Sequence, residues 1–219
     1  MTTASRNAPL PAGPAGPRRP IAAFDFDGTL TVKDSFTAFL AWRTSHVRCL
    51  VGLARIAPAL LSYLLHRDRG RLKAVAVGQF LAGMPREALE GEAAAFAAQT
   101  RARLLRPDAL ACWEDWGRRG ALRIIVTASP TAIVAPFARA LGADELIGTE
   151  LAYDAEGHVT GAFVTPNCRA QEKVTRLRAR FGQDVRLAAA YGDTGGDTEM
   201  LAIAEVAGFR LFTGRPKPI

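Results

Sequence analysis

The sequence predicts an α/β fold in which a mainly parallel, doubly wound sheet carries an inserted all-helical cap domain. In residues 108–219, short apolar runs that suit buried strands alternate with helical stretches, which favours parallel strands joined by helices. Residues 35–107 instead contain many helix formers and only weak strand signals. We therefore expect a Rossmann-like core of residues 21–34 and 108–219, with a helical cap of residues 35–107 inserted into it.

Residues 1–20 are rich in alanine, proline and glycine and contain no long apolar run. They do not fit a secretory signal, because such a signal needs an apolar core after its positive start. Arg18 and Arg19 are followed at once by Pro20, which does not match a twin-arginine signal. We expect residues 1–20 to be a disordered leader.

The overall composition is that of a soluble globular protein, with 49% apolar and 22% charged residues. The three cysteines, Cys49, Cys112 and Cys168, are scattered and odd in number, so they predict neither a disulfide framework nor a paired-cysteine metal site. The three histidines also lack metal-ligand spacing. These features predict a cytoplasmic protein.

The stretch 21–30 begins as a buried strand and contains two acids, Asp25 and Asp27. Because successive side chains of a strand point to opposite faces, the two carboxylates would share one side. Like charges this close repel unless a cation, a proton or hydrogen bonds relieve them, so the pair indicates a metal or chemistry. The alternative is an ordinary loop in which Asp27 or Thr29 caps a helix.

The predicted cap carries all the excess positive charge of the chain. Its eleven basic residues outnumber four acidic ones, whereas the rest of the chain is balanced and the total is +7. Such a segment could attract acidic partners, although charged surfaces are often merely solvated. We expect helices at 36–44, 47–65, 71–81 and 86–105, with breaks at Gly70, Gly83, Pro85 and Pro107.

The segment 49–65 is apolar on almost every side, apart from a narrow polar stripe that includes Arg55 and Ser62. It is short for a membrane span, which needs about 20 apolar residues, and Pro58 interrupts it. Two interpretations stay open: a buried helix of the cap, or a helix lying in a membrane surface. The narrow polar stripe favours burial.

Beyond Pro107 the pattern alternates between strands and helices. The expected elements are helix 108–119, strand 122–126, helix 131–141, a hairpin of 150–153 and 158–163, helix 170–181, strand 186–191, helix 198–204 and a last short strand at 206–212.

Polar groups follow three of the predicted strands: Asp25 with Asp27, Thr127 with Ser129, and Asp193. The carboxyl ends of parallel strands share one edge, so these groups can converge. Oxygen ligands without a matching histidine or cysteine favour Mg²⁺, and a phosphate beside carboxylates would need a cation as well as the metal.

Lys173 is the candidate cation, although by itself it could be an ordinary solvated lysine. Asp193 and Asp197 flank a tight glycine turn. The structural alternative makes Asp193 a turn residue and Asp197 a helix cap.

Taken together, four stretches resemble the ordered motifs of the haloacid dehalogenase superfamily. They are Asp25-Phe26-Asp27-Gly28-Thr29-Leu30-Thr31, Thr127-Ala128-Ser129, Lys173, and Gly192-Asp193-Thr194-Gly195-Gly196-Asp197. The resemblance spans residues 21 to about 205. The first motif is the specific one, and the order of all four strengthens it.

The resemblance implies a covalent aspartyl-phosphate mechanism. Asp25 would attack phosphorus, Asp27 would act as acid and then base, Thr127 would bind the phosphoryl group and Lys173 would neutralise charge. Mg²⁺ would be held by Asp25, the Asp27 backbone and Asp193, with Asp197 nearby.

The inserted cap, the Thr127-Ala128-Ser129-Pro130 motif and Asn167-Cys168 before Lys173 resemble subfamily IB, the phosphoserine phosphatase-like branch. Gly28, Thr127, Ala128 and Asp34 would bind substrate, Asp34 matching an acid that holds the amino acid in phosphoserine phosphatases. Gly28 and the basic, apolar cap look more like phosphatidylglycerophosphatase C. The common Val-Asn-Pro run is missing after the last motif, which leaves the closing strand and the last ten residues open.

We therefore expect an Mg²⁺-dependent phosphomonoester hydrolase that prefers a lipid or amphiphilic phosphate. The alternatives are a phosphoserine phosphatase-like enzyme for small metabolites and a membrane-surface module that keeps the fold without activity. The basic cap leaves open a peripheral position at the inner face of the membrane. Nucleic acid is not expected as a partner, because the cap has few aromatics for stacking and no known binding motif.

Overall fold

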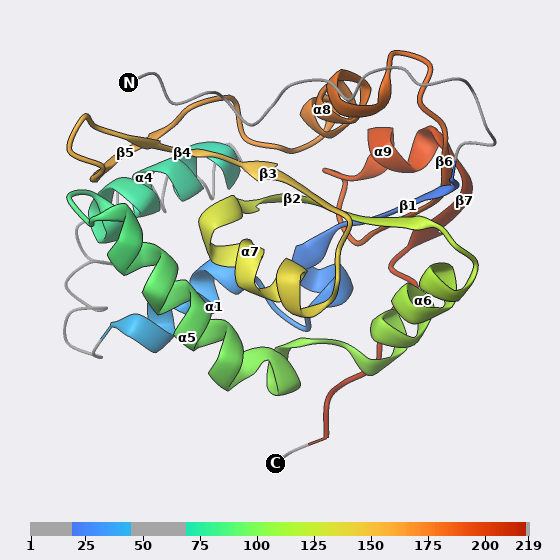
Figure 1. Cartoon of the computed structure of the whole chain (residues 1–219), viewed down its shortest axis with the longest axis horizontal. Helices are drawn as coiled ribbons and strands as arrows, with labels where there is room; N and C mark the ends of the chain where they lie inside the picture. Colours follow the sequence, from blue (N-terminus) through green and yellow to red (C-terminus); the bar gives the residue numbers. More distant parts are fainter. Residues whose placement is uncertain (1–18, 45–68, 218–219) are drawn as a thin grey trace.

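The centre of the protein is a five-stranded sheet in which every neighbouring pair of strands is parallel. The computed structural model describes residues 19–44 and 69–217. The strand order is β3 (Glu145–Thr149), β2 (Leu122–Pro130), β1 (Ile21–Phe24), β6 (Leu187–Gly192) and β7 (Ala204–Phe209). Figure 1 shows β1 in the middle of this sheet. From β1 the chain first builds the sheet toward β2 and β3 and then, on the other side of β1, toward β6 and β7. The carboxyl end of β1 is therefore the topological switch point, where such sheets bind ligands.

The register brings the ends of the three inner strands level with one another. Phe24, the last residue of β1, lies opposite Ile125 of β2 and Tyr191 of β6. The Asp25 N–H continues the ladder by donating to the Tyr191 carbonyl at 2.9 Å. The first acid of the leading motif therefore stands where β1 leaves the sheet, between its two neighbours.

Helices cover both faces of the sheet, as Figure 1 shows. Phe24 and Ile125 face one apolar cluster with α6 (Pro107–Arg118) and α7 (Thr131–Ala140). Ala23 and Ile124 face a second cluster with α8 (Gln171–Phe181) and α9 (Thr198–Ala202). Neighbouring residues of one strand serve opposite clusters because of the strand's two-residue period. The predicted doubly wound α/β architecture is confirmed.

Three further helices lie between β1 and α6 in the chain: α1 (Ser35–Arg43), α4 (Arg69–Leu81) and α5 (Arg86–Leu104). They agree with three of the helices expected there. Aromatic contacts join α5 to the helices beside it, since Phe96 lies 5.5 Å from Phe39 of α1 and 5.7 Å from Phe137 of α7 between ring centroids. The side chains of α1 and α5 thus belong to the same apolar cluster as one face of the sheet.

Two expectations lie outside the described residues: the helix at 47–65 and nearly all of the leader. Within the described parts of the chain, the structure contains no helix that is both long and apolar enough to span a membrane.

A separate antiparallel pair, β4 (Leu151–Tyr153) and β5 (Val159–Phe163), confirms the expected hairpin. This hairpin packs against α4, as Figure 1 shows. Gly161 permits the approach, because a Cβ there would lie 2.9 Å from the Cα of Gly78.

One strand was not predicted, and the bounds of several elements differ from the sequence prediction. Strand β2, expected at 122–126, continues to Pro130. Strand β3 was not predicted, because its five residues include a charged Glu145 and a glycine and show little periodicity. The last strand is Ala204–Phe209 rather than 206–212, and the preceding helix ends at Ala202 rather than 204. Pairing with β6 decides this register, and Arg210, with a φ of 53°, ends the strand as its N–H bonds to Gly192.

Candidate active site

The two acids of the first motif lie on the loop that leaves β1. The strand ends at Phe24 and a single wide turn, η1 (Phe26–Leu30), follows it. The expectation that Asp25 and Asp27 point to the same side of one strand is therefore wrong, because neither residue lies in β1. Asp25 remains beside the sheet, whereas the turn carries the Asp27 carboxylate toward α1.

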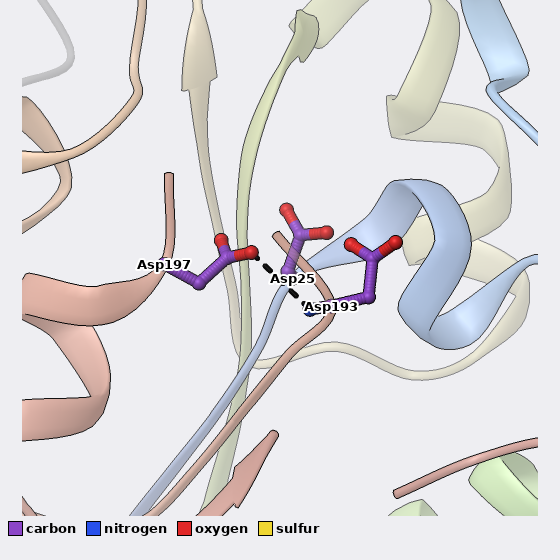
Figure 2. A group of neighbouring side chains, drawn as sticks. All are labelled: Asp25, Asp193 and Asp197. Atoms are coloured by element: carbon purple, nitrogen blue, oxygen red, sulfur yellow. Dashed lines mark hydrogen bonds between the residues drawn. The ribbon is translucent and has the colours of Figure 1, made fainter. Parts of the chain in front are cut away.

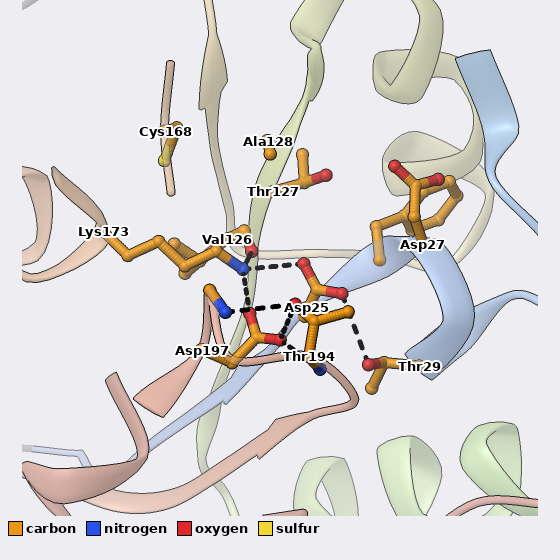
Figure 3. A network of polar contacts seen from close by, with 12 residues as sticks. Asp25, Asp27, Thr29, Val126, Thr127, Ala128, Cys168, Lys173, Thr194 and Asp197 are labelled. Atoms are coloured by element: carbon orange, nitrogen blue, oxygen red, sulfur yellow. Dashed lines mark hydrogen bonds and ion pairs between the residues drawn. The ribbon is translucent and has the colours of Figure 1, made fainter. Parts of the chain in front are cut away.

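Asp25 is buried and bound to Lys173 of α8. The Lys173 ammonium donates to Asp25 Oδ1 at 2.6 Å, to the Val126 carbonyl at 2.6 Å and to Asp197 Oδ1 at 2.7 Å (Figure 3). These bonds use all three of its donors. The side chain of Lys173 is only 1% exposed, so the interpretation of an ordinary solvated lysine is wrong.

Burial has opposite consequences for these charged groups. It raises the pKa of Asp25 to about 7, because the loss of water outweighs the attraction of Lys173. Although burial alone would lower the pKa of Lys173, the charges of Asp25 and Asp197 raise it above its ordinary value. Lys173 therefore stays cationic between the two acids.

The side chain of Asp197 closes the turn after β6 and makes no capping bond to α9. Its Oδ2 accepts from the Asp193 N–H at 3.2 Å and from the Thr194 N–H and hydroxyl at 3.0 and 3.1 Å. Asp197 occupies the N-cap position of α9, as the helix-cap alternative expected, but its side chain forms no hydrogen bond to the N-terminus of that helix. Burial would raise the pKa of Asp197, but Lys173 and the hydrogen bonds lower it below its ordinary value.

Asp193 supplies the third carboxylate. One ligand oxygen each from Asp25, Asp193 and Asp197 can be chosen so that all lie within 4.8 Å of one another (Figure 2). Asp193 Oδ1 is buried and has no hydrogen-bond partner among the described residues. An unpartnered buried carboxylate oxygen is costly without a cation, so this donor set fits a hard ion such as Mg²⁺. Burial and the charge of Asp197 raise the pKa of Asp193.

Gly28 lies directly against the Asp193 carboxylate. Its φ of +84° favours glycine, and a Cβ at this position would overlap Asp193. The structure therefore shows a reason for glycine here that the sequence did not reveal, namely the close approach of the first motif to the last.

Asp27 is held from three directions. Its Oδ1 accepts from the Ser35 N–H at 2.7 Å, and its Oδ2 accepts from the Ser129 hydroxyl. The Lys73 ammonium lies 4.0 Å from the same Oδ2. Burial and the charge of Asp34 raise the pKa of Asp27 above its ordinary value, because they outweigh the three contacts, which lower this pKa. The bond to Ser35, the first residue of α1, gives this aspartate a structural contact, although the N-cap residue of α1 is Asp34.

Lys73 of α4 is the site residue that sequence reasoning missed. Its ammonium donates to the Ser129 hydroxyl at 3.0 Å and lies 3.6 Å from Asp34 Oδ2. The rarity of lysine could have pointed to Lys73, because only four lysines occur among 28 basic residues. The many arginines of the surrounding segment obscured this feature.

The remaining predicted residues occupy different positions around the site. Thr127 is fully buried, and its hydroxyl accepts from the Ser129 N–H at 3.0 Å, whereas Ala128 lines the cavity. Asp34 also lines the cavity and accepts from the Thr37 N–H at 2.7 Å at the start of α1. Burial would raise the pKa of Asp34, but Lys73 and this bond lower it below its ordinary value.

These groups surround a cavity of about 510 Å³. Four of its five acids follow β1 or β6, the fifth, Asp34, precedes α1, and Lys173 comes from α8. Its apolar side is supplied by α1 and α4, through Phe36, Leu40, Leu72, Ala76 and Phe80. One side of the cavity can thus bind charge, and the other can bind an apolar group.

The sequence model of the haloacid dehalogenase-like hydrolase family matches residues 22–202. The chain belongs to this family. The superfamily assignment made from the four motifs is confirmed, and the protein is a hydrolase by family.

The chain is 58% identical to Protein CicA of Caulobacter vibrioides over 196 residues, which cover 90% of this chain and 88% of that protein. A Bordetella pertussis protein described as of unknown function matches with a TM-score of 0.68 and 26% identity, over 84% of this chain and 86% of that one. A phosphoserine phosphatase, solved as a phospho-aspartyl intermediate analogue, has the same fold at a TM-score of 0.57 and 17% identity, with 86% and 85% covered.

Proposed function

We propose that this hydrolase is an Mg²⁺-dependent phosphomonoesterase that works through an aspartyl-phosphate on Asp25. The observation that carries the proposal is the position of the Asp25 carboxylate. It lines the cavity, is bound by Lys173 and has an oxygen within 4.8 Å of one from Asp193, whose Oδ1 has no hydrogen-bond partner among the described residues. The same fold in a phosphoserine phosphatase solved as a phospho-aspartyl intermediate analogue supports this choice.

In the first step, the Asp25 carboxylate forms a bond to phosphorus while the ester P–O bond breaks. Asp27 gives its proton to the departing alkoxide. In the second step, a water molecule attacks the phosphorus of the aspartyl-phosphate and Asp27 takes a proton from that water. Inorganic phosphate leaves and the Asp25 carboxylate is restored.

This role for Asp27 is supported by its position in the cavity lining beside Lys73, whose ammonium lies 4.0 Å from the Asp27 Oδ2 that also accepts from the Ser129 hydroxyl. Lys173 keeps the Asp25 carboxylate in place and offsets the negative charge that accumulates there. Thr127 would assist by holding the end of β2 that presents Ala128, because its buried hydroxyl accepts from the Ser129 N–H.

The donors that would hold Mg²⁺ are Asp25, the Asp27 backbone carbonyl and Asp193. When bound, the ion would neutralise negative charge on the phosphoryl oxygens. Asp197 would act indirectly, because both of its oxygens are engaged by Lys173 and by the 193–194 turn.

We propose that residues 35–107 form a cap inserted into a core of residues 21–34 and 108–219, and that the cap selects the substrate. Residues of α1 and α4 supply the apolar side of the cavity together with Lys73. Such caps exclude water and choose substrates in enzymes with lids.

An amphiphilic or lipid phosphate suits this cavity better than phosphoserine does. Its apolar side would contact an apolar leaving group. Asp34, the acid expected to hold a substrate ammonium, lies 3.6 Å from Lys73, so its charge is already balanced. A small amino-acid phosphate remains the second candidate, supported by the presence of Asp34 in the cavity lining. The non-enzyme alternative has less support, because the reactive residues are in contact with one another.

The decisive experiment compares the wild type with Asp25→Asn. The substitution removes the nucleophilic oxygen but keeps a similar shape, so release of phosphate from an aryl phosphate with Mg²⁺ should fall to background. Unchanged turnover in this variant would refute the mechanism, and no turnover in the wild type on any phosphate would favour the non-enzyme alternative.

A release screen over lipid, amino-acid, sugar and nucleotide phosphates then separates the substrate classes. Flotation with anionic vesicles at low salt tests the peripheral membrane position, which would accompany a cytoplasmic location.

A further inference from the structure

A second cavity, of about 560 Å³, lies between the C-terminal end of α5 and the chain segment 212–216. Arg103, Arg106 and Arg215 line it, with no acidic residue among the described residues that form its wall. It shares no lining residue with the cavity that contains Asp25. Its volume falls within the range of about 300–1,000 Å³ that is typical of small-molecule sites.

The charges around this second cavity are unbalanced. None of its three arginines forms an ion pair with an acid in residues 19–44 or 69–217. The nearby Asp108 instead accepts two backbone N–H groups of the C-terminal segment, at 2.8 and 2.7 Å. Three guanidinium groups around one space repel one another, and an anion between them would remove that cost.

The central arginine is already fixed in position. Arg106 Nε donates to the carbonyls of Gly28 and Thr31 at 3.2 and 3.1 Å, and its Nη1 donates to the Gly214 carbonyl at 3.1 Å. Its Nη2 has no partner within the described parts of the chain. A guanidinium fixed in this way loses little entropy when it binds an oxyanion.

A purely structural role explains only one of the two outer arginines of this cavity. Arg103 lies in the last turn of α5, where a cation is favourable to the helix dipole. This does not explain Arg215, which comes from the other side of the cavity, is exposed and has no ion-pair partner among the described residues.

We propose that the second cavity is a binding site for a phosphate-bearing ligand, separate from the catalytic site. Guanidinium groups match the geometry and the double charge of a phosphate group, and three of them can contact more than one of its oxygens. The ligand is either a soluble phosphate compound or the headgroup of an anionic phospholipid. Because the contact between Arg106 and Gly28 joins this cavity to the first motif, an occupied site would stabilise the loop that carries Asp27.

The test uses two double variants of the full chain with the same loss of charge. Arg103→Gln with Arg215→Gln removes two arginines that line the cavity. Arg101→Gln with Lys217→Gln removes two exposed charges from the same segments, outside the lining. The soluble probe is inorganic pyrophosphate with EDTA, followed by calorimetry. The lipid probe compares vesicles of phosphatidylcholine with and without phosphatidic acid.

We expect one of the two probes to bind the cavity variant about 100-fold more weakly than the matched control, at about 10-fold for each guanidinium removed. A difference with pyrophosphate indicates a soluble ligand, and a difference only with phosphatidic acid vesicles indicates a headgroup. Equal binding of both probes to the two variants would overturn the proposal. The assay contains no turnover step, so its result is independent of the proposed phosphatase activity, which neither variant should change.

Discussion

The contact between Gly28 and Asp193 leads to the sharpest prediction, because it links one methyl group to the proposed metal site. Gly28→Ala places a Cβ on the Asp193 carboxylate, at a backbone φ of +84°. The left-handed backbone alone costs about 1–2 kcal/mol for a residue with a Cβ. Overlap adds about 1–3 kcal/mol if the surroundings must move. Since Asp193 ends in a short flexible carboxylate, we expect it to rotate away, which weakens its ability to bind a cation.

A matched control is available at Gly157, where φ is +83° and no atom lies within 4 Å of the added Cβ. In Gly157→Ala the free energy of unfolding should therefore fall only by the cost of the left-handed backbone, about 1–2 kcal/mol. The two variants are compared by urea unfolding and by the dependence of phosphate release on Mg²⁺ concentration. We expect Gly28→Ala to be at least as unstable as Gly157→Ala and to lose about 100-fold or more of the activity. The reasoning is refuted if both variants keep the same Mg²⁺ dependence and the same turnover.

Three further predictions concern the charged groups. Lys173→Met leaves two buried carboxylates without their cation, so the free energy of unfolding in urea at pH 7 should fall by about 3–5 kcal/mol. Lys73→Met should lower turnover about 10- to 100-fold through loss of a charged hydrogen bond beside the cavity, whereas Lys33→Met should not. Asp108→Asn should lower the melting temperature at neutral pH and have little effect in acid. Burial raises the pKa of Asp108, but backbone hydrogen bonds lower it below its ordinary value, so its stabilisation exists above about pH 4 and disappears as the pH falls through the lower folded value.

Each of these has a result that would contradict it. A loss below about 1 kcal/mol in Lys173→Met would mean that the two acids share a proton instead of needing the lysine. Equal turnover of the Lys73 and Lys33 variants would place Lys73 outside the working site, since Lys33 is exposed. A melting difference for Asp108→Asn that grows as the pH falls would reverse the sign expected from its hydrogen bonds.

Much of the fold was predictable because its elements have strong local signals. The apolar runs of β1 and β6, the helices α1, α5 and α8, and the hairpin were all expected from periodicity and turn residues. Strand β3 was missed because it is short and partly polar, and its identity depends on pairing with β2. The predicted position of the boundary between α9 and β7 was wrong for a similar reason, since pairing with β6 determines where β7 begins.

The active site was likewise predictable only in part. The order of the four motifs in the sequence indicates Asp25, Lys173, Asp193 and Asp197 as neighbours, and the structure brings them together. The turn after Phe24 separates the Asp27 carboxylate from Asp25 and directs it toward Ser35, which strand alternation alone did not predict.

By itself, the sequence determined the fold class, the family and the acids that end the central strands, because these depend on residue type and short spacing. Only the tertiary structure decided which partner each charge has. Lys73 and Asp27 are 46 positions apart and Arg106 and Gly28 are 78 positions apart, so no local pattern relates them. Such contacts follow from packing α4, the end of α5 and the C-terminal segment around one sheet, which is a property of the folded chain.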